Sequence, residues 1–290
     1  MEQDAMTFRD MLASDDAYLA PAVFNPLSAK LAEQAGFKVL YLGGGTLGYL
    51  KCCLEANLNL TELVQAGVEI RGVTILPLIL DAACGFGDPM HMHHTLTLAE
   101  AAGFCAIEIE DQLIPKRAHH HIGVEHMIPS ELMAAKIKEA VSARRSPEFV
   151  IIARTNAVRQ TGMDDALARG LAYREAGADM LYIAPRSPEE AREIARRLPP
   201  PFMFSYESSG ERAGAGLSLR ELGALGYRIL SVANTALAFH RAMKQTYDSI
   251  AHEEANPVMA GTTNREEQVA LHQTVGFDEL IAIEKATVEK

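Results

Sequence analysis

The stretch EAAGFCAIEIEDQ, residues 100–112, shows how the chain is organised. It predicts the end of a helix, a glycine at the position of a left-handed C-terminal cap, a short apolar strand and then a run of polar residues. Related turns occur elsewhere in the chain, as EQAGF (33–37), REAGAD (174–179) and GALGY (223–227). These similar turns from helix to strand indicate a fold made of repeated β/α units.

Short apolar runs alternate with amphipathic stretches along the whole chain. Apolar and polar residues do not clearly alternate within each run, which is typical of strands buried on both faces of a parallel sheet. The expected strands are residues 19–24, 38–42, 75–80, 104–109, 149–153, 180–184, 202–205 and 228–232. The expected helices between them are residues 26–35, 60–70, 89–102, 130–143, 163–176, 188–198 and 218–225.

These units favour an α/β fold with one closed (β/α)8 TIM-type barrel, which we expect to occupy residues 1–250. An open Rossmann-like sheet is the alternative, although no G-x-G-x-x-G follows the first expected strand. Towards the C-terminus we expect a helix at 235–254, a polar segment at 254–267 and a last helix at 268–290. We expect residues 251–290 to form a helical extension that packs on a neighbouring subunit.

The composition excludes several classes of protein. With 290 residues, 48% of them hydrophobic, the chain can bury a large core. Its formal net charge of −11 argues against a nucleic-acid partner. No C-x-x-C motif is present, so neither a disulfide framework nor a zinc ribbon is indicated. Because we find no signal peptide and no apolar run long enough for a membrane span, we expect a cytoplasmic protein with no membrane partner.

Acidic and basic residues follow three neighbouring strands at the point where each strand ends. Asp81 closes an all-apolar strand, which is costly unless the carboxylate is paired or binds a metal. Glu108 and Glu110 share one face of the next strand, which we expect to be the face at the barrel mouth. Arg154 ends the following strand and supplies a cation. The set suits a divalent cation with oxygen ligands, most simply Mg²⁺, and the alternative is a buried ion-pair network.

Two other strand ends carry candidate contacts for a substrate. The first expected strand ends at Asn25, and the second ends in Gly43, Gly44 and Gly45. The bare backbone amides of this triple glycine are suited to hold a carboxylate or a phosphate. A flexible loop is the alternative interpretation of the three glycines.

Histidines occur in two runs. The first run, His91, His93 and His94, falls in the first turn of an expected helix, where histidines more often form a solvated face. The second run, at 119–121 with His126 nearby, lies in the loop after the fourth strand, on the catalytic side of a barrel. We expect one histidine of the second run to act as an acid or a substrate ligand, and a zinc site is the alternative.

Four longer stretches of the sequence can be compared with known protein families. They are NPLSAKLAEQAGFKVLYLGGG (25–45), DAACGFGDP (81–89), IEIEDQLIPKRAHHH (107–121) and FVIIARTNA (149–157). In their order and spacing they resemble the isocitrate lyase/phosphoenolpyruvate mutase superfamily, from about residue 19 to about residue 247. The resemblance implies a (β/α)8 barrel that uses Mg²⁺ or Mn²⁺ and acts on 2-oxo or 2-hydroxy carboxylates through an enolate-like species. It also implies homodimers or homotetramers that exchange a C-terminal helix.

The resemblance assigns metal-binding roles by position. Asp81 matches the first Asp of the family motif D-x-D-x-G-[YF]-G and is expected to be the closest metal ligand. Glu110 matches the metal-site Glu of the EDQ motif. Glu55, in LEANLNLTEL, resembles an Asp that contacts the metal through a water molecule.

The resemblance also assigns substrate contacts. Arg154 matches the arginine of the ART motif, which binds the substrate carboxylate. Tyr41, Gly44 and Gly45 match the Y-L-S-G-G loop, whose amides hold the carboxylate of pyruvate-like or glyoxylate-like products.

This chain departs from the family pattern at several positions. Ala83 replaces the second Asp of D-x-D, Gly43 replaces the Ser of the glycine loop, and Ala184 stands where a Glu is expected after the sixth strand. Lys116 begins a KRAHH stretch where C–C lyases such as methylisocitrate lyase carry K-R-C-G-H. The Cys that protonates the departing enolate in those lyases is Ala118 here.

The sequence therefore predicts a Mg²⁺-dependent lyase that cleaves a C–C bond of a small 2-oxo or 2-hydroxy di- or tricarboxylate. Oxaloacetate and a methylisocitrate-like acid are the expected types of substrate, cleaved by decarboxylation or a retro-aldol step through a metal-stabilised enolate. The expected catalytic residues are Arg154, Lys116, His119 and His120, with a histidine or water replacing the thiol as proton donor. The alternatives are a phosphonopyruvate-type P–C bond mutase or hydrolase, and a catalytically degenerate barrel with a binding role.

Overall fold

The computed structural model describes residues 6–206 and 213–289. By its contacts the chain divides into two compact units, Met1–Thr235 and Ala236–Lys290. This division falls at the start of the helix predicted at 235–254. The predicted domain boundary, with a barrel at 1–250 and an extension at 251–290, stays a prediction. No helix within the described ranges is long and apolar enough to cross a membrane.

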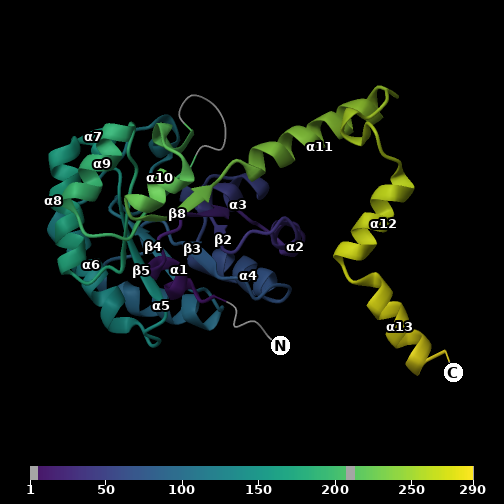
Figure 1. The fold of residues 1–290 in the computed structure, drawn as a ribbon, viewed down its shortest axis with the longest axis horizontal. Helices are drawn as coiled ribbons and strands as arrows, with labels where there is room; N and C mark the ends of the chain where they lie inside the picture. Colours follow the sequence, from purple (N-terminus) through teal and green to yellow (C-terminus); the bar gives the residue numbers. More distant parts are fainter. Residues whose placement is uncertain (1–5, 207–212, 290) are drawn as a thin grey trace. The chain divides into compact units, whose positions relative to one another are not determined.

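The first unit is built on an eight-stranded parallel sheet (Figure 1). The strand order is β1-β8-β7-β6-β5-β4-β3-β2, so β1 and β2 stand at its two ends. A hydrogen bond connects these two ends, because the N–H of Val23, after β1, donates to the carbonyl of Tyr41 in β2 (2.9 Å). This nearly closed sheet confirms the predicted (β/α)8 TIM-type barrel, and the Rossmann-like alternative is wrong. The strands are β1 (Tyr18–Pro21), β2 (Leu40–Leu42), β3 (Leu78–Asp81), β4 (Ala106–Glu110), β5 (Val150–Thr155), β6 (Met180–Ile183), β7 (Phe202–Ser205) and β8 (Tyr227–Val232).

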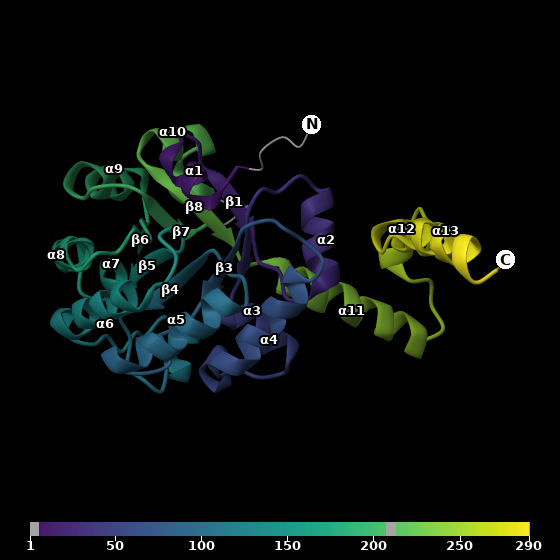
Figure 2. The ribbon, with the colours of Figure 1, turned by 90° about the horizontal axis from the view of Figure 1, so that it is seen from below.

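Helices cover the outside of this sheet (Figure 2). Every helix predicted between strands is present, whereas α1, α3 and α7 were not expected. The helices are α1 (Phe8–Ala13), α2 (Pro26–Gln34), α3 (Gly44–Leu50), α4 (Leu60–Arg71), α5 (Met92–Ala101), α6 (Ser130–Ala143), α7 (Ala157–Gln160), α8 (Met163–Glu175), α9 (Pro188–Arg197) and α10 (Leu219–Ala224). Side-chain oxygens of Asn59 and Ser218 accept backbone N–H groups at the starts of α4 and α10, which explains why these helices begin there.

The strands are buried on both faces, as their apolar pattern indicates. Leu78, Ile79 and Leu80 of β3 have no exposed surface. Burial of each such side chain contributes about 1.5–3 kcal/mol to stability. At Gly67 of α4 an added Cβ would lie 2.2 Å from the ring of Phe104, so α4 packs closely only because this residue has no side chain. A tightly packed sheet of this kind holds the strand ends in fixed positions.

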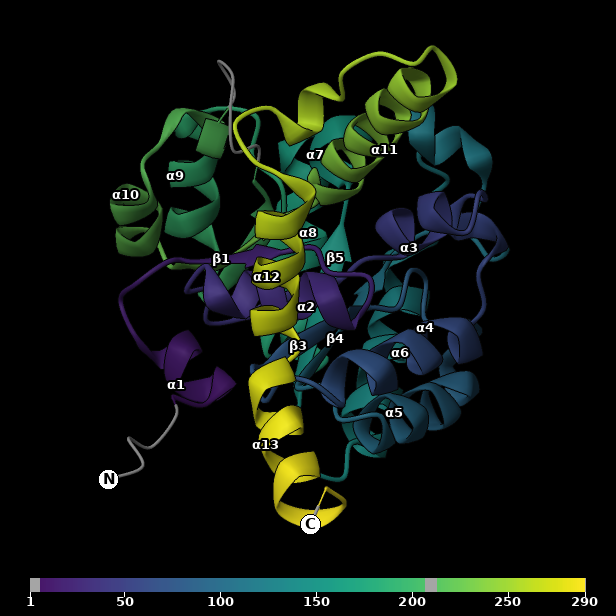
Figure 3. The ribbon, with the colours of Figure 1, turned by 90° about the vertical axis from the view of Figure 1, so that its right-hand side faces the viewer.

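The second unit contains α11 (Thr235–Ala251), α12 (Asn264–Thr274) and α13 (Phe277–Thr287). Thr235, the first residue of α11, still belongs to the first unit. Figure 3 shows the three as separate helices. The prediction of one helix over 268–290 was wrong, because Gly276 adopts a left-handed conformation (φ 73°) between α12 and α13. The predicted polar segment 254–267 is shorter than expected, since α12 already begins inside it. Packing of this unit on a neighbouring subunit stays a prediction.

Candidate active site

The charged residues predicted at the barrel mouth meet at the carboxyl ends of β3, β4 and β5. In the parallel sheet Asp81 pairs with Glu108, and Glu110 pairs with Arg154. The exposed fractions are 7% for Asp81, 0% for Glu108 and 1% for Glu110. Carboxylates buried to this degree are stable only with hydrogen bonds and cations nearby.

Glu108 lies between a tyrosine and an arginine. Tyr41 Oη donates to Glu108 Oε2 (2.9 Å), and Arg154 Nη1 donates to Oε1 (2.8 Å). The pKa of Glu108 is raised to about 8, first by burial and then by the nearby charge of Asp81, and Arg154 opposes both effects only in part. Glu108 therefore takes up a proton near neutral pH unless another cation lies nearby.

Glu110, two residues further along β4, has more cationic partners. Its Oε2 accepts a hydrogen bond from Asn156 Nδ2 (2.9 Å) and lies 3.0 Å from Arg154 Nε. Its Oε1 lies 2.7 Å from Lys116 Nζ. Burial favours the neutral acid, but Arg154 and Lys116 outweigh it and lower the pKa of Glu110 to about 2. Glu110 is thus a carboxylate throughout the physiological range.

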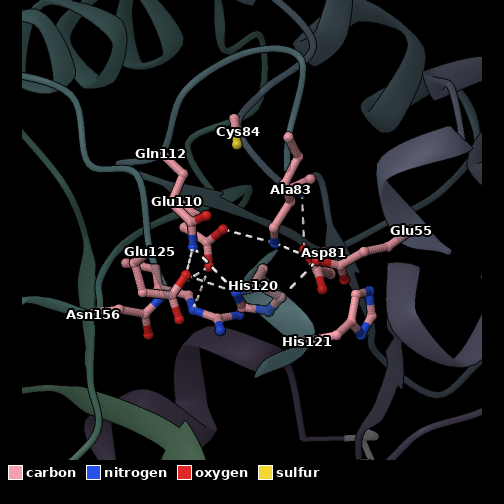
Figure 4. A network of polar contacts seen from close by, with 12 residues as sticks. Glu55, Asp81, Ala83, Cys84, Glu110, Gln112, His120, His121, Glu125 and Asn156 are labelled. Atoms are coloured by element: carbon pink, nitrogen blue, oxygen red, sulfur yellow. Dashed lines mark hydrogen bonds and ion pairs between the residues drawn. The ribbon is translucent and has the colours of Figure 1, made fainter. Parts of the chain in front are cut away.

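The loop after β4 brings a lysine and a histidine into the same site. Lys116 forms ion pairs with Glu55 and Glu110, and only 5% of its side chain is exposed. His120 Nε2 lies 3.5 Å from Glu55 Oε1, and its Nδ1 lies 2.7 Å from Glu125 Oε2. Figure 4 shows His120 with Glu55, Glu125 and Asp81 around it. The predicted residues Glu55, Lys116 and His120 are therefore brought together.

The neighbouring histidines have different surroundings. His119 is exposed, and its Nδ1 lies 3.2 Å from Nε2 of His126. His121 Nδ1 lies 3.1 Å from Tyr49 Oη. His93 of the first run is half exposed and pairs with a surface glutamate, as expected for a solvated face. Of the two histidines predicted to be catalytic, His120 lies in the site and His119 does not contact its carboxylates.

The predicted substrate contacts after β1 and β2 lie at helix starts. Asn25 Oδ1 accepts a backbone N–H of α2 (2.8 Å) and so caps that helix. Gly44 and Gly45 are the first residues of α3, and Gly43 caps it, so the triple glycine is not the flexible loop considered as an alternative. An added Cβ at Gly44 would lie 3.2 Å from Glu55 Cβ, which places this backbone next to the site. Contact of these residues with a substrate stays a prediction.

Asp81 has few partners for so buried a carboxylate. Among the described residues, its hydrogen bond is the one that Oδ1 accepts from the backbone N–H of Ala83 (2.9 Å). No ion pair joins Asp81 to a lysine, arginine or histidine in this part of the chain. Asp81 is thus a buried carboxylate that this part of the chain does not pair with a cation.

The donor atoms around Asp81 fit Mg²⁺ in their chemistry. Asp81, Glu110 and Glu55 offer carboxylate oxygens, the ligands that Mg²⁺ prefers, and Mg²⁺ commonly takes one or two carboxylates and keeps several waters. The described residues do not bring three or more His, Cys, Asp or Glu side chains around one point, so water would complete the shell. The ammonium group of Lys116 lies between Glu55 and Glu110 in this structure.

Four further residues belong to the site although the sequence assigned them no role. Glu125, whose side chain is fully buried, accepts hydrogen bonds from Gln112 and Arg159 and lies beside His120. Asn156 donates to Glu110. Asn156 is the first residue after β5 and Gln112 is the second residue after β4, so their positions near strand ends were a usable signal. Glu125 and Arg159 lie in a loop and a short helix, where no spacing rule identifies them.

A cavity of about 310 Å³ opens beside the site at the carboxyl ends of β5, β6 and β7. Asn156 and Arg159 line it, together with Ala184, the position at which the family resemblance led us to expect a glutamate. Its volume lies at the lower end of the range for pockets that bind small molecules.

Comparison with known proteins gives similarities over the whole barrel. A family model described as phosphoenolpyruvate phosphomutase matches residues 8–251. The 2,3-dimethylmalate lyase of Eubacterium barkeri is 36% identical over 228 residues, 78% of each chain. The oxaloacetate decarboxylase of Chromohalobacter salexigens is 34% identical over 271 residues, 92% of this chain and 91% of its own. The crystal structure of phosphonopyruvate hydrolase with oxalate and Mg²⁺ superposes with a TM-score of 0.81 at 28% identity, covering 97% of this chain and 98% of that one.

Proposed function

Because the chain belongs to the isocitrate lyase/phosphoenolpyruvate mutase superfamily, we propose that it is a Mg²⁺-dependent lyase that cleaves a C–C bond. The proposed substrates are small 2-oxo or 2-hydroxy di- or tricarboxylates, such as oxaloacetate or a methylisocitrate-like acid. Cleavage is by decarboxylation or by a retro-aldol step. The two relatives named above, a lyase and a decarboxylase, support this class of reaction.

One observation carries the proposal. Two buried carboxylates, Asp81 and Glu110, lie at neighbouring strand ends with the guanidinium of Arg154 and the ammonium of Lys116 beside them. An arrangement of this kind can hold a cation and an organic anion side by side. Electrostatic stabilisation is greatest where such charges are fixed before the reaction begins.

The residues of this chain have separate tasks in the proposed reaction. Asp81 and Glu110 would hold the Mg²⁺ ion, which would supply a Lewis acid for the 2-oxygen of the substrate. Arg154 anchors the substrate carboxylate: its Nη1 and Nε contact Glu108 and Glu110, and Nη2 has no ion-pair partner among the described residues. The backbone amides of residues 43–45 assist in holding the same carboxylate.

His120 is the proposed proton donor in place of the thiol that Ala118 lacks. It reaches the site from the loop after β4, and 17% of its side chain is exposed. Glu55 and Glu125 lie on either side of its ring and hold it in one orientation. His119 is not suited to this task, because it is exposed and contacts His126 instead.

A phosphonopyruvate-type enzyme that cleaves or forms a P–C bond is the second candidate. The structural similarity to phosphonopyruvate hydrolase favours it. The EDQ and PKR stretches at 110–112 and 115–117 resemble the C–C lyases instead. Lys116 of the PKR stretch contacts two carboxylates of the site, so this stretch belongs to the proposed active centre.

A substrate screen separates these candidates. The purified protein is incubated with Mg²⁺ and with oxaloacetate, methylisocitrate, dimethylmalate or phosphonopyruvate, and both pyruvate and free phosphate are measured. We expect pyruvate without phosphate from one of the three carbon acids, at a rate that His120→Asn lowers by about 10²–10³-fold. Phosphate release from phosphonopyruvate alone, or its conversion to phosphoenolpyruvate, would support the second candidate. No turnover of any compound, with Mg²⁺ bound, would favour the degenerate barrel.

A further inference from the structure

Lys136 of α6 is a lysine buried outside the candidate active site. Its exposed fraction is 1%, and no carboxylate lies within ion-pair distance of it in residues 6–206 and 213–289. Burial lowers the pKa of this lysine, as expected for an ammonium group removed from water. A methionine of similar length would fill the same space without this cost, so a specific contact has to offset it.

That contact is with the loop between β3 and α5. Lys136 Nζ donates a hydrogen bond to the backbone carbonyl of Cys84. Cys84 lies three residues after Asp81, in a segment that belongs to neither strand nor helix. A hydrogen bond from a charged donor is stronger than one between neutral groups, especially where water is excluded.

The loop that Lys136 contacts has an unusual backbone. Ala83 (φ 47°), Gly85 (φ 80°) and Phe86 (φ 58°) all adopt left-handed conformations. Glycine tolerates this, but alanine and phenylalanine do so only where the surrounding contacts hold them. A second contact comes from α5, where Thr95 Oγ1 donates to the carbonyl of Gly85 (3.0 Å).

The same loop fixes two carboxylate-bearing residues of the site. The N–H of Ala83 donates to Asp81 Oδ1 (2.9 Å), and the carbonyl of Ala83 accepts from the N–H of Glu110 (2.8 Å). Its backbone therefore sets the direction of the Asp81 carboxylate and the distance between β3 and β4 at their ends.

We propose that Lys136 is a positioning residue that holds the loop at 82–87 and thereby orients Asp81 for a divalent cation. This inference rests on the cation site of the proposed function. Lys136 touches neither the cation nor the substrate, and it acts through the Cys84 carbonyl. Partners that orient metal ligands in this way commonly affect metal affinity about 10–100-fold.

The test compares Lys136→Met with the wild-type protein in two measurements. Calorimetric titration of the metal-free protein with Mg²⁺ gives the Kd, and hydrogen exchange of the metal-free protein gives the protection of amides 82–87. We expect Lys136→Met to raise the Kd about 10-fold and to speed exchange in this loop. Ile137→Ala is the matched control, since Ile137 is fully buried in the same helix and carries no polar group. It should lower stability and leave both measurements unchanged.

The outcomes are distinct. Wild-type Kd and loop protection in Lys136→Met, with a stability loss like that of Ile137→Ala, would overturn the inference. If Lys136→Met does not fold, Thr95→Val removes the other contact of the loop and should shift both measurements in the same direction. Unchanged values there would also overturn the inference. A wild-type protein that binds no Mg²⁺, but whose loop loses protection in Lys136→Met, would contradict the proposed function and leave the role of Lys136 in the loop standing.

Discussion

Two polar clusters, one partly buried and one buried, lie at opposite ends of the barrel, and their charges are balanced differently. At the amino end, Asp179 precedes β6 and pairs with Arg9 (3.1 Å) and Arg144 (2.6 Å). It also accepts the backbone N–H of Ile151 (2.8 Å). One carboxylate therefore meets two cations, and the cluster needs no further partner. It joins α1, the end of α6 and the start of β6, and it has the character of a structural ion-pair network.

The cluster at the carboxyl end has an excess of acid. Its cations of fixed charge are Arg154, Lys116 and Arg159. Its carboxyl groups are those of Glu55, Asp81, Glu108, Glu110 and Glu125. The pKa of Glu108 is raised first by burial, and the nearby charge of Asp81 adds to this effect. Ion pairing is therefore common to both clusters, whereas deeper burial and an excess of carboxyl groups distinguish the candidate active site.

Removal of Asp81 should have the largest effect. In Asp81→Ala the proposed cation loses its closest ligand, and we expect turnover of the substrate to fall about 10³-fold. The measurement is pyruvate formation under saturating Mg²⁺, with folding checked by circular dichroism. Asp179→Asn is the matched control in the other cluster and should keep turnover. Equal losses in the two variants would remove the distinction between the clusters.

Arg154→Lys should have the next largest effect. The substitution keeps the charge, but an ammonium group cannot contact Glu108, Glu110 and a substrate carboxylate with the planar geometry of a guanidinium. We expect kcat/KM to fall about 10²-fold. Steady-state kinetics measure this change. A variant with wild-type kcat/KM would show that Arg154 serves only to compensate the buried glutamates.

Glu108→Gln should change how stability depends on pH. The folded pKa of Glu108 is raised to about 8, so between about pH 4.5 and pH 8 the folded state holds a proton that the unfolded state has released. Glu108 therefore lowers the stability of the metal-free protein as pH rises through this window, by on the order of a few kcal/mol. Urea unfolding at several pH values should show a smaller decline in Glu108→Gln. An identical decline would indicate that Glu108 is ionised.

Asp179→Asn should affect stability alone. Loss of the carboxylate leaves Arg9 and Arg144 without their partner, and we expect the free energy of unfolding to fall by about 2 kcal/mol, less than for a fully buried pair because Arg9 is partly exposed. Urea unfolding measures the loss, and Mg²⁺ affinity should stay as in the wild type. Weaker Mg²⁺ binding in this variant would mean that the two clusters are coupled through the barrel.

Much of the fold could be predicted from the sequence because its signals are local. Buried parallel strands appear as apolar runs, and the turns that end in Gly36, Gly103, Gly177 and Gly226 mark where helices stop. The triple glycine was harder to predict. Glycine is a poor helix former, and Gly44 enters α3 at a place where a side chain would meet Glu55.

The site was predictable where its residues follow strand ends. Asp81, Glu110 and Arg154 belong to this group, because the barrel brings consecutive strand ends together. The contact of His120 with Glu125 depends on the path of a long loop, which no periodic pattern describes. No local pattern shows that Lys136 of α6 contacts Cys84 in the loop between β3 and α5.

The central claim is that a divalent cation binds between the ends of β3 and β4. Anomalous diffraction from crystals soaked with Mn²⁺ in place of Mg²⁺ tests it most directly. We expect a strong anomalous peak about 2–2.5 Å from a carboxylate oxygen of Asp81, with Glu110 bound directly or through water. A peak among His119, His121 and His126, with none at Asp81, would contradict the claim.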